Sequence, residues 1–231
     1  DLYKPRFRKY FQKEIEEIKK EFGSFVLINT NFYYGNPLSG LKSRFTDLGD
    51  GWDSYTVRDD QARMKFVNLW KHEHKIMSNF VALIHKLSIV FPKKKFILRP
   101  HPGENEETYK MLFSDVGNIH IEKRGAVSSW ILASDLVIHD GCTTAVESYM
   151  AEVPIINYKS EKNPLYDIDL PNQLGVRCEN EKEIIEKTIN KIYNLIEVIQ
   201  ILGDEYNFIF KSVILFNSKP WMKPDEKSKR N

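Results

Sequence analysis

The sequence has 231 residues, enough for one large α/β domain whose core folds without disulfides. Its 34 Lys+Arg and 32 Asp+Glu give a net charge of +2, which by itself indicates neither a nucleic acid nor a membrane surface as partner. The two cysteines, Cys142 and Cys178, lack the spacing of a zinc site or a disulfide framework, so we expect a reducing compartment, the cytoplasm. No apolar run is long enough for an integral membrane segment. Because the chain opens at Asp1 inside a helical pattern, we expect a piece of a longer polypeptide.

The N-terminal part predicts an amphipathic helix at 7–22, ended by Gly23. A short apolar run at 25–28 follows, and its lack of polar positions favours a strand buried on both faces. Residues 33–60 then predict a long loop, and loops of that length are usually functional or mobile.

Helices and strands alternate through the rest of the chain. We predict helices at 61–91, 105–114, 127–133, 143–151 and 180–200, and strands at 96–98, 119–121, 136–138, 154–158 and near Val176. This alternation predicts a doubly wound parallel sheet, a Rossmann-like α/β fold. We expect a single domain over 1–218 and a polar, basic tail over 219–231.

Polar clusters follow three of the predicted strands, at 29–31, 99–104 and 139–144. In open parallel sheets, ligands bind beyond the carboxyl ends of the strands. The clusters therefore predict one shared ligand site. Asn29 and Asn31 are candidate substrate ligands, although an Asx turn explains them at least as well.

The segment at 99–104 reads Arg-Pro-His-Pro-Gly-Glu. Pro102 restricts His101 to extended geometry, so the strand ends in a stiff turn. In an extended chain Arg99 and His101 lie on the same side, where two cations would suit a phosphate. The alternative is a rigid turn in which His101 is hydrogen-bonded to the backbone.

The segment at 139–147 reads His-Asp-Gly-Cys-Thr-Thr-Ala-Val-Glu. Gly141 permits a tight turn, and Thr143 and Thr144 begin the next helix, where free N–H groups favour an anion. Glu147 lies one turn further on the same face and could accept hydrogen bonds from ribose or sugar hydroxyls. The alternative is an ordinary helix cap with Glu147 solvated.

No residues in the sequence suggest a metal site. The long predicted helix carries His72, Glu73, His74 and His85; His72 and His74 point to different faces, so we interpret these residues as solvated. Cys142 has no base near it in sequence, and we interpret it as a small packed side chain rather than a nucleophile.

Three stretches together resemble the bacterial surface carbohydrate biosynthesis proteins: 22–32, 99–104 and 139–147. The resemblance extends over about residues 1 to 200. That family is similar to GT-B glycosyltransferases, including capsule Kdo transferases and bacterial sialyltransferases. The resemblance implies that His101 and Pro102 grip the phosphate of a CMP-sugar and that Thr143 and Thr144 grip its nucleotide. It also implies, more loosely, that Glu147 holds the ribose.

The resemblance implies the donor-binding C-terminal half of a glycosyltransferase of surface polysaccharide biosynthesis. Its partners would be a nucleotide sugar, with a CMP-linked acidic sugar as the candidate donor, a carbohydrate acceptor and an absent N-terminal half. We expect action in the cytoplasm, including the inner face of the membrane, without a cofactor. His101 with the threonines would stabilise the charge of the leaving nucleotide.

Two alternatives stay open. A nucleotide-sugar 2-epimerase shares the two-half architecture and needs acid and base carboxylates, for which Glu104 and Asp140 are the candidates near the predicted site. The other alternative is a non-catalytic nucleotide-binding module. A P-loop enzyme is disfavoured because the sequence has no Gly-rich loop ending in Lys-Ser/Thr.

Overall fold

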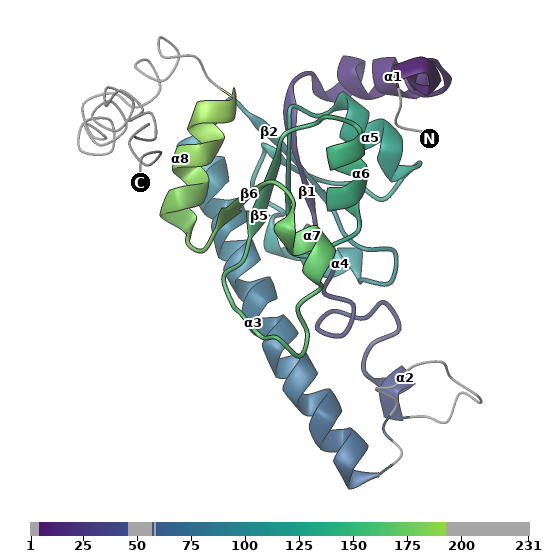
Figure 1. Ribbon diagram of the computed structural model, residues 1–231, viewed down its shortest axis with the longest axis vertical. Helices are drawn as coiled ribbons and strands as arrows, with labels where there is room; N and C mark the ends of the chain where they lie inside the picture. The colour runs from purple at the N-terminus through teal and green to yellow at the C-terminus, as the bar shows by residue number, and fades with distance from the viewer. Residues whose placement is uncertain (1–4, 46–56, 58, 193–231) are drawn as a thin grey trace, which may run out of the picture. The chain divides into compact units, whose positions relative to one another are not determined.

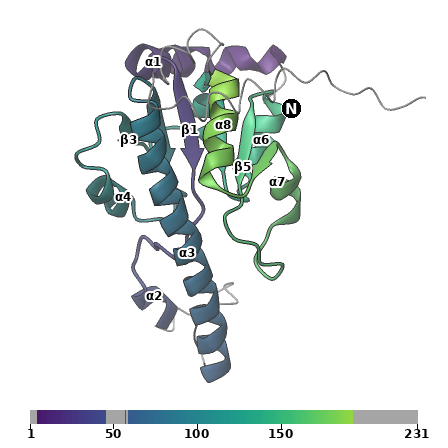
Figure 2. The same ribbon diagram turned by 90° about the vertical axis from the view of Figure 1, so that its left-hand side faces the viewer.

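A computed structural model describes residues 5–45, 57 and 59–192, and it confirms the predicted α/β class. Six parallel strands form one sheet in the order β3-β2-β1-β4-β5-β6 (Figures 1 and 2). The strands are β1 (Phe25–Asn29), β2 (Lys95–Arg99), β3 (Ile119–Ile121), β4 (Leu136–His139), β5 (Ile155–Tyr158) and β6 (Val176–Cys178). This is the strand order of dinucleotide-binding Rossmann folds.

Each predicted helix is present, and where the structure describes its ends they lie within a few residues of the prediction; two short helices, at 42–45 and 169–173, were not predicted. They are η1 (Pro5–Phe11), α1 (Gln12–Phe22), α2 (Lys42–Phe45), α3 (Asp60–Val90), α4 (Glu106–Leu112), α5 (Val127–Ala133), α6 (Thr144–Met150), α7 (Asp169–Gln173) and α8 (Glu181–Ile192). The first predicted helix begins as a 3₁₀ turn, a common form at helix starts. None of the helices in the described ranges has both the length and the apolar character to cross a bilayer.

Parts of four predictions lie outside the described residues. They are most of the second half of the loop at 33–60, the end of the last predicted helix beyond residue 192, the ends of the predicted domain at 1–4 and 193–218, and the tail at 219–231.

The two faces of the sheet bury alternate residues of the same strands. Phe25 and Leu27 of β1 face α1 and α5, where Phe22 and Trp130 complete an aromatic cluster with centroids 5.6 Å apart. Residues of α3 cover the opposite face, and the ring of Phe80 lies 5.1 Å from that of Tyr158. Every residue of β1 is buried, which explains its continuous apolar run.

The register brings the carboxyl ends of the central strands to one level. Asn29 of β1 pairs with Arg99 of β2 on one side and with His139 of β4 on the other. The chain leaves β1 towards β2 and β3, whereas it leaves β4 towards β5 and β6. The loops that follow β1 and β4 therefore diverge, and a sheet of this order has its ligand crevice at that switch point.

Candidate functional site

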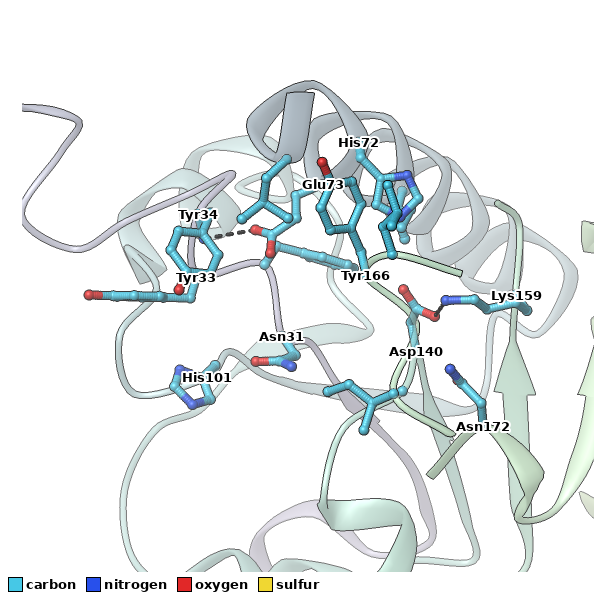
Figure 3. Close-up of a pocket in the computed structure, with 16 residues that line it drawn as sticks. Asn31, Tyr33, Tyr34, His72, Glu73, His101, Asp140, Lys159, Tyr166 and Asn172 are labelled. Atoms are coloured by element: carbon cyan, nitrogen blue, oxygen red, sulfur yellow. Dashed lines mark hydrogen bonds and ion pairs between the residues drawn. The ribbon is translucent and has the colours of Figure 1, made fainter. Parts of the chain in front are cut away.

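A cavity of about 330 Å³ lies at this switch point (Figure 3). It is lined by the loops after β1, β2, β4 and β5, by α3 and by α7. The lining residues are Asn31, Phe32, Tyr33, Tyr34, Leu69, His72, Glu73, Ile76, His101, Asp140, Gly141, Lys159, Leu165, Tyr166, Ile168 and Asn172. The site expected beyond the strand ends thus corresponds to a real cavity.

The structure brings only some of the predicted site residues to the cavity. Four of them line it: Asn31, His101, Asp140 and Gly141. The others are not among the lining residues: Asn29, Arg99, Pro102, Glu104, Thr143, Thr144 and Glu147.

His101 is exposed on the stiff turn after β2, as its position before a proline predicts. Its Nδ1 accepts the N–H of Gly103 at 3.1 Å. The neutral ring therefore carries its proton on Nε2, which makes Nε2 a hydrogen-bond donor. Gly103 also packs closely on Tyr33, since a Cβ at position 103 would lie 2.5 Å from the ring.

Arg99 does not face the cavity with His101. Its guanidinium donates to the carbonyls of Arg124 and Gly125 at 2.7 and 3.1 Å and lies 5.2 Å from the ring centre of Trp130. The expectation that Arg99 and His101 lie on the same side of an extended chain is wrong, because β2 ends at Arg99 and the chain turns before His101. Burial lowers the pKa of Arg99 to about 10, which leaves it charged at neutral pH.

Glu104 is fully buried, away from the solvent that reaches the cavity. Its carboxylate accepts from Thr30 Oγ1 at 2.9 Å, Phe32 N at 3.1 Å, His101 N at 3.0 Å and Tyr109 Oη at 2.5 Å. Burial raises its pKa. These contacts join the loops after β1 and β2, so the carboxylate positions His101. Glu104 itself is not among the residues that line the cavity.

Asp140 forms a buried ion pair with Lys159, the first residue after β5. The Lys159 ammonium lies 3.1 Å from Asp140 Oδ1 and 2.7 Å from Asp167 Oδ1. The side chains of Lys159 and Asp140 are only 5% and 7% exposed. Burial raises the pKa of Asp140, and Lys159 opposes that rise. Our sequence reasoning missed Lys159, although it stands at a strand end like the predicted clusters.

Glu73 of α3 was also missed. Its Oε2 accepts the N–H groups of Tyr34 and Gly35, each at 2.7 Å, and burial raises its pKa to about 7. The interpretation of this helix segment as solvated is therefore wrong for Glu73. A signal was present, because Glu73 stands four residues after Leu69 and three before Ile76, on the buried stripe of the helix.

The neighbouring histidines are half-buried, and burial lowers the pKa of both His72 and His74. The ring of His72 lies 5.2 Å from that of Tyr166, and His74 packs edge-on against Trp70. Within the described part of the chain, no three His, Cys, Asp or Glu side chains are grouped so that they could hold a metal.

The turn into α6 has the geometry that its glycine predicts. Gly141 has φ +62°, and a Cβ there would lie 3.1 Å from Asn172 Oδ1. Thr143 occupies the cap position of α6 but makes no side-chain cap hydrogen bond. Thr144 Oγ1 contacts the Sγ of Cys142, a buried thiol whose pKa burial raises to about 11. Glu147 is half-buried one turn along α6.

No family model and no curated protein matches the sequence. Among solved structures, the chain is similar to the Methanocaldococcus jannaschii UDP-GlcNAc 2-epimerase in complex with UDP-GlcNAc and UDP, with 12% identity and a TM-score of 0.50 over 90% of this chain and 50% of that one. The chain is 13% identical to the Neisseria meningitidis UDP-GlcNAc 2-epimerase bound to UDP-GlcNAc, with a TM-score of 0.44 over 94% of this chain and 50% of that one. It is 12% identical to the E. coli heptosyltransferase WaaC with ADP, with a TM-score of 0.39 over 73% of this chain and 45% of that one.

The chain spans about half the length of these structures. At such low identity the likeness concerns the fold, and it rests on the first structure. The chain therefore has a Rossmann-like α/β fold, which it shares with the first of these structures.

Proposed function

We propose that this chain is the nucleotide-sugar-binding half of a glycosyltransferase. The observation that carries the proposal is the cavity at the switch point of a 3-2-1-4-5-6 sheet, where Rossmann folds bind nucleotides. Its lining includes a histidine with a donor nitrogen and a glycine turn beside Asn172. The fold of a structure complexed with UDP-GlcNAc and UDP supports the same reading.

In this proposal His101 binds the phosphate of the donor. Its Nε2–H donates to a phosphate oxygen, and this interaction strengthens as negative charge develops on the leaving nucleotide. The tight turn at Gly141 lets the backbone approach the ligand closely. The sequence resemblance adds Thr143, Thr144 and Glu147 as nucleotide contacts; these residues follow the Gly141 turn and are not among those that line the cavity.

Finer assignments rest on the sequence resemblance. It favours a CMP-linked donor, a growing surface polysaccharide as acceptor, and action in the cytoplasm or at the inner face of the membrane. We propose one domain over 1–218, to which a second half adds the acceptor site and the catalytic base.

Calorimetric titration with CMP, CDP, UMP, UDP and GDP tests the nucleotide site. The proposal predicts selective binding by at least one nucleotide and weaker binding by His101→Ala, since His101 lines the cavity. Thr144→Ala tests separately the contact that the sequence resemblance implies. Glu107→Ala is the matched control, since Glu107 is exposed on α4 and does not line the cavity. Equal loss in the control, or no loss in His101→Ala, would contradict the proposed site.

A 2-epimerase is the second candidate, and one observation favours it. Two carboxylates, Glu73 and Asp140, line the cavity, and the pKa of about 7 for Glu73 suits proton transfer near neutral pH. Product analysis with UDP-GlcNAc separates the candidates. An epimerase yields an isomeric sugar without an acceptor, whereas a transferase moves the sugar onto an acceptor.

A further inference from the structure

Asp140 and Lys159 lie together on one side of the cavity, which we call the acidic end, and Glu73 lies on the α3 wall beside the backbone of Tyr34. Figure 3 shows Asp140 and Lys159 across the cavity from His101, with Glu73 on the α3 side. His101, by contrast, lies beside Asn31. A donor whose phosphate binds at His101 would therefore extend its sugar towards the acidic end.

The acidic end has no cation to spare for a ligand. Lys159 is the one lysine or arginine among the lining residues, and its ammonium already lies between Asp140 and Asp167. Lys159, Asp140 and Asp167 together carry a net negative charge when all three are ionised. His72 adds little positive charge at neutral pH, because burial and Lys159 lower its pKa.

Burial makes this arrangement costly to rearrange. With Lys159 only 5% exposed, a ligand carboxylate could reach the ammonium only by displacing Asp140 or Asp167. The displaced carboxylate would lose its partner in a poorly hydrated place, which is strongly unfavourable. A second anion would also be repelled by Asp140 itself and by Glu73 when it is ionised.

The cavity also offers groups that suit hydroxyls. Both N–H groups on Glu73 donate to Oε2, which leaves Oε1 outside those two hydrogen bonds. The side chain of Asn172 lines the cavity; its Oδ1 accepts from Asn157 Nδ2 at 3.2 Å, and its amide nitrogen is a further donor. The rings of Tyr166 and His72, 5.2 Å apart, line the cavity as well, and aromatic rings are surfaces that pack on the C–H face of a sugar ring.

We infer that the acidic end accepts an uncharged, hydroxyl-bearing sugar ring and discriminates against a sugar that carries a carboxylate. The inference rests on the proposed nucleotide-sugar function and deepens it. It departs from the acidic sugar that the sequence resemblance implies.

A matched pair of ligands tests this without knowledge of the base: α-glucose 1-phosphate and α-glucuronic acid 1-phosphate. They differ only in a hydroxymethyl group against a carboxylate. We expect tighter binding of glucose 1-phosphate to the full chain by about tenfold or more, measured by amide chemical-shift titration at pH 8. Equal or tighter binding of the glucuronate would overturn the inference.

Two variants locate the discrimination. Glu73→Gln and Asp140→Asn each remove one negative charge with little change of shape, so each should narrow the preference for glucose 1-phosphate several-fold. Glu107→Gln, outside the cavity, should leave the preference unchanged. If Asp140→Asn fails to fold, Glu73→Gln remains as the test of repulsion by the cavity carboxylates. A preference for glucose 1-phosphate that is unchanged in Glu73→Gln at pH 8 would contradict that repulsion.

The nucleotide titration keeps the two proposals apart. A nucleotide could bind through His101 while neither sugar phosphate changes the amide chemical shifts around Asp140 and Asn172. In that case the inference about the sugar fails and the proposed nucleotide site stands. If neither the nucleotides nor the sugar phosphates bind, both proposals fail.

Discussion

The carboxylate of Glu73 accepts the backbone N–H of Tyr34 at 2.7 Å, although 39 positions separate the two residues in the chain. The same oxygen accepts the N–H of Gly35, and a Cβ at Gly35 would lie 3.2 Å from the Cβ of Glu73. Helix α3 and the loop after β1 are therefore joined tightly along one wall of the cavity. The two hydrogen bonds that join α3 to this loop depend on the largely buried Glu73 carboxylate.

We predict that Glu73 makes stability depend on pH. Burial raises its pKa from 4.5 to about 7, so the folded protein holds this proton where the unfolded chain releases it. The contribution is fully present below pH 4.5 and is lost as pH rises to about 7, by about 3 kcal/mol. Urea unfolding at pH 4.5 and 7.5 measures it.

Glu73→Gln is the comparison, since Glu104 and Asp140 also have raised pKa values and act in the same direction. The variant should lose the share of the pH dependence that belongs to Glu73. Curves of equal pH dependence for the variant and the unsubstituted chain would refute the assignment.

Glu104→Ala should destabilise the fold by about 3 kcal/mol or more, because it leaves four donors without their acceptor in a buried place. Glu104→Gln keeps the shape and one acceptor oxygen and should cost less. Glu107→Ala, an exposed control on the same helix region, should change the unfolding free energy by about 0.5 kcal/mol at most. Denaturant titration of the three variants checks the order, and a Glu104→Ala cost similar to that of the control would be incompatible with a positioning role.

Gly141→Ala should lower stability by about 1 kcal/mol or more and weaken nucleotide binding. Its φ of +62° is unfavourable for alanine, and the new methyl group would press on Asn172 Oδ1 at 3.1 Å. Gly117→Ala is the matched control, since a Cβ there meets nothing within 4 Å. Unfolding and calorimetry on both variants test this, and equal effects would speak against a special turn at Gly141.

Both cysteines should be inert to Ellman's reagent in the native protein at pH 8. Burial raises the pKa of Cys142 and of Cys178 to about 11, so thiolate is scarce and access is poor. The chain has two cysteines in all, so two thiols should react in guanidinium chloride. A fast-reacting thiol in the native state would instead indicate an accessible nucleophile.

The centre of the sheet was predictable because strands such as β1 and β4 are buried on both faces. Runs such as 25–28 and 136–138 contain no polar residue, and few structures other than a covered parallel strand accommodate that pattern in so short a segment. The strand-end rule then located the loops at 29–31, 99–104 and 139–144, all of which border the cavity in part.

Individual side-chain directions were less predictable. Alternation describes a strand, so it could not place His101 once the chain had left β2 at Arg99. The roles of Glu73 and Glu104 depend on partners far away in sequence, at 34–35 and at 30–32, which no local pattern reveals. The position of Glu73 within the apolar stripe of α3 was the local sign that its carboxylate has a partner elsewhere in the chain.

The proposed nucleotide site lies in the cavity between the loops after β1, β2 and β4. Its most direct test is an amide chemical-shift map of the ¹⁵N-labelled chain with CMP, CDP, UMP, UDP and GDP, each added separately. We predict that at least one nucleotide shifts the amides at 31–35, 101–104 and 140–144 and leaves those of β6 and α8 in place. Shifts confined to other parts of the chain, or no shift with any of the five nucleotides, would contradict the claim.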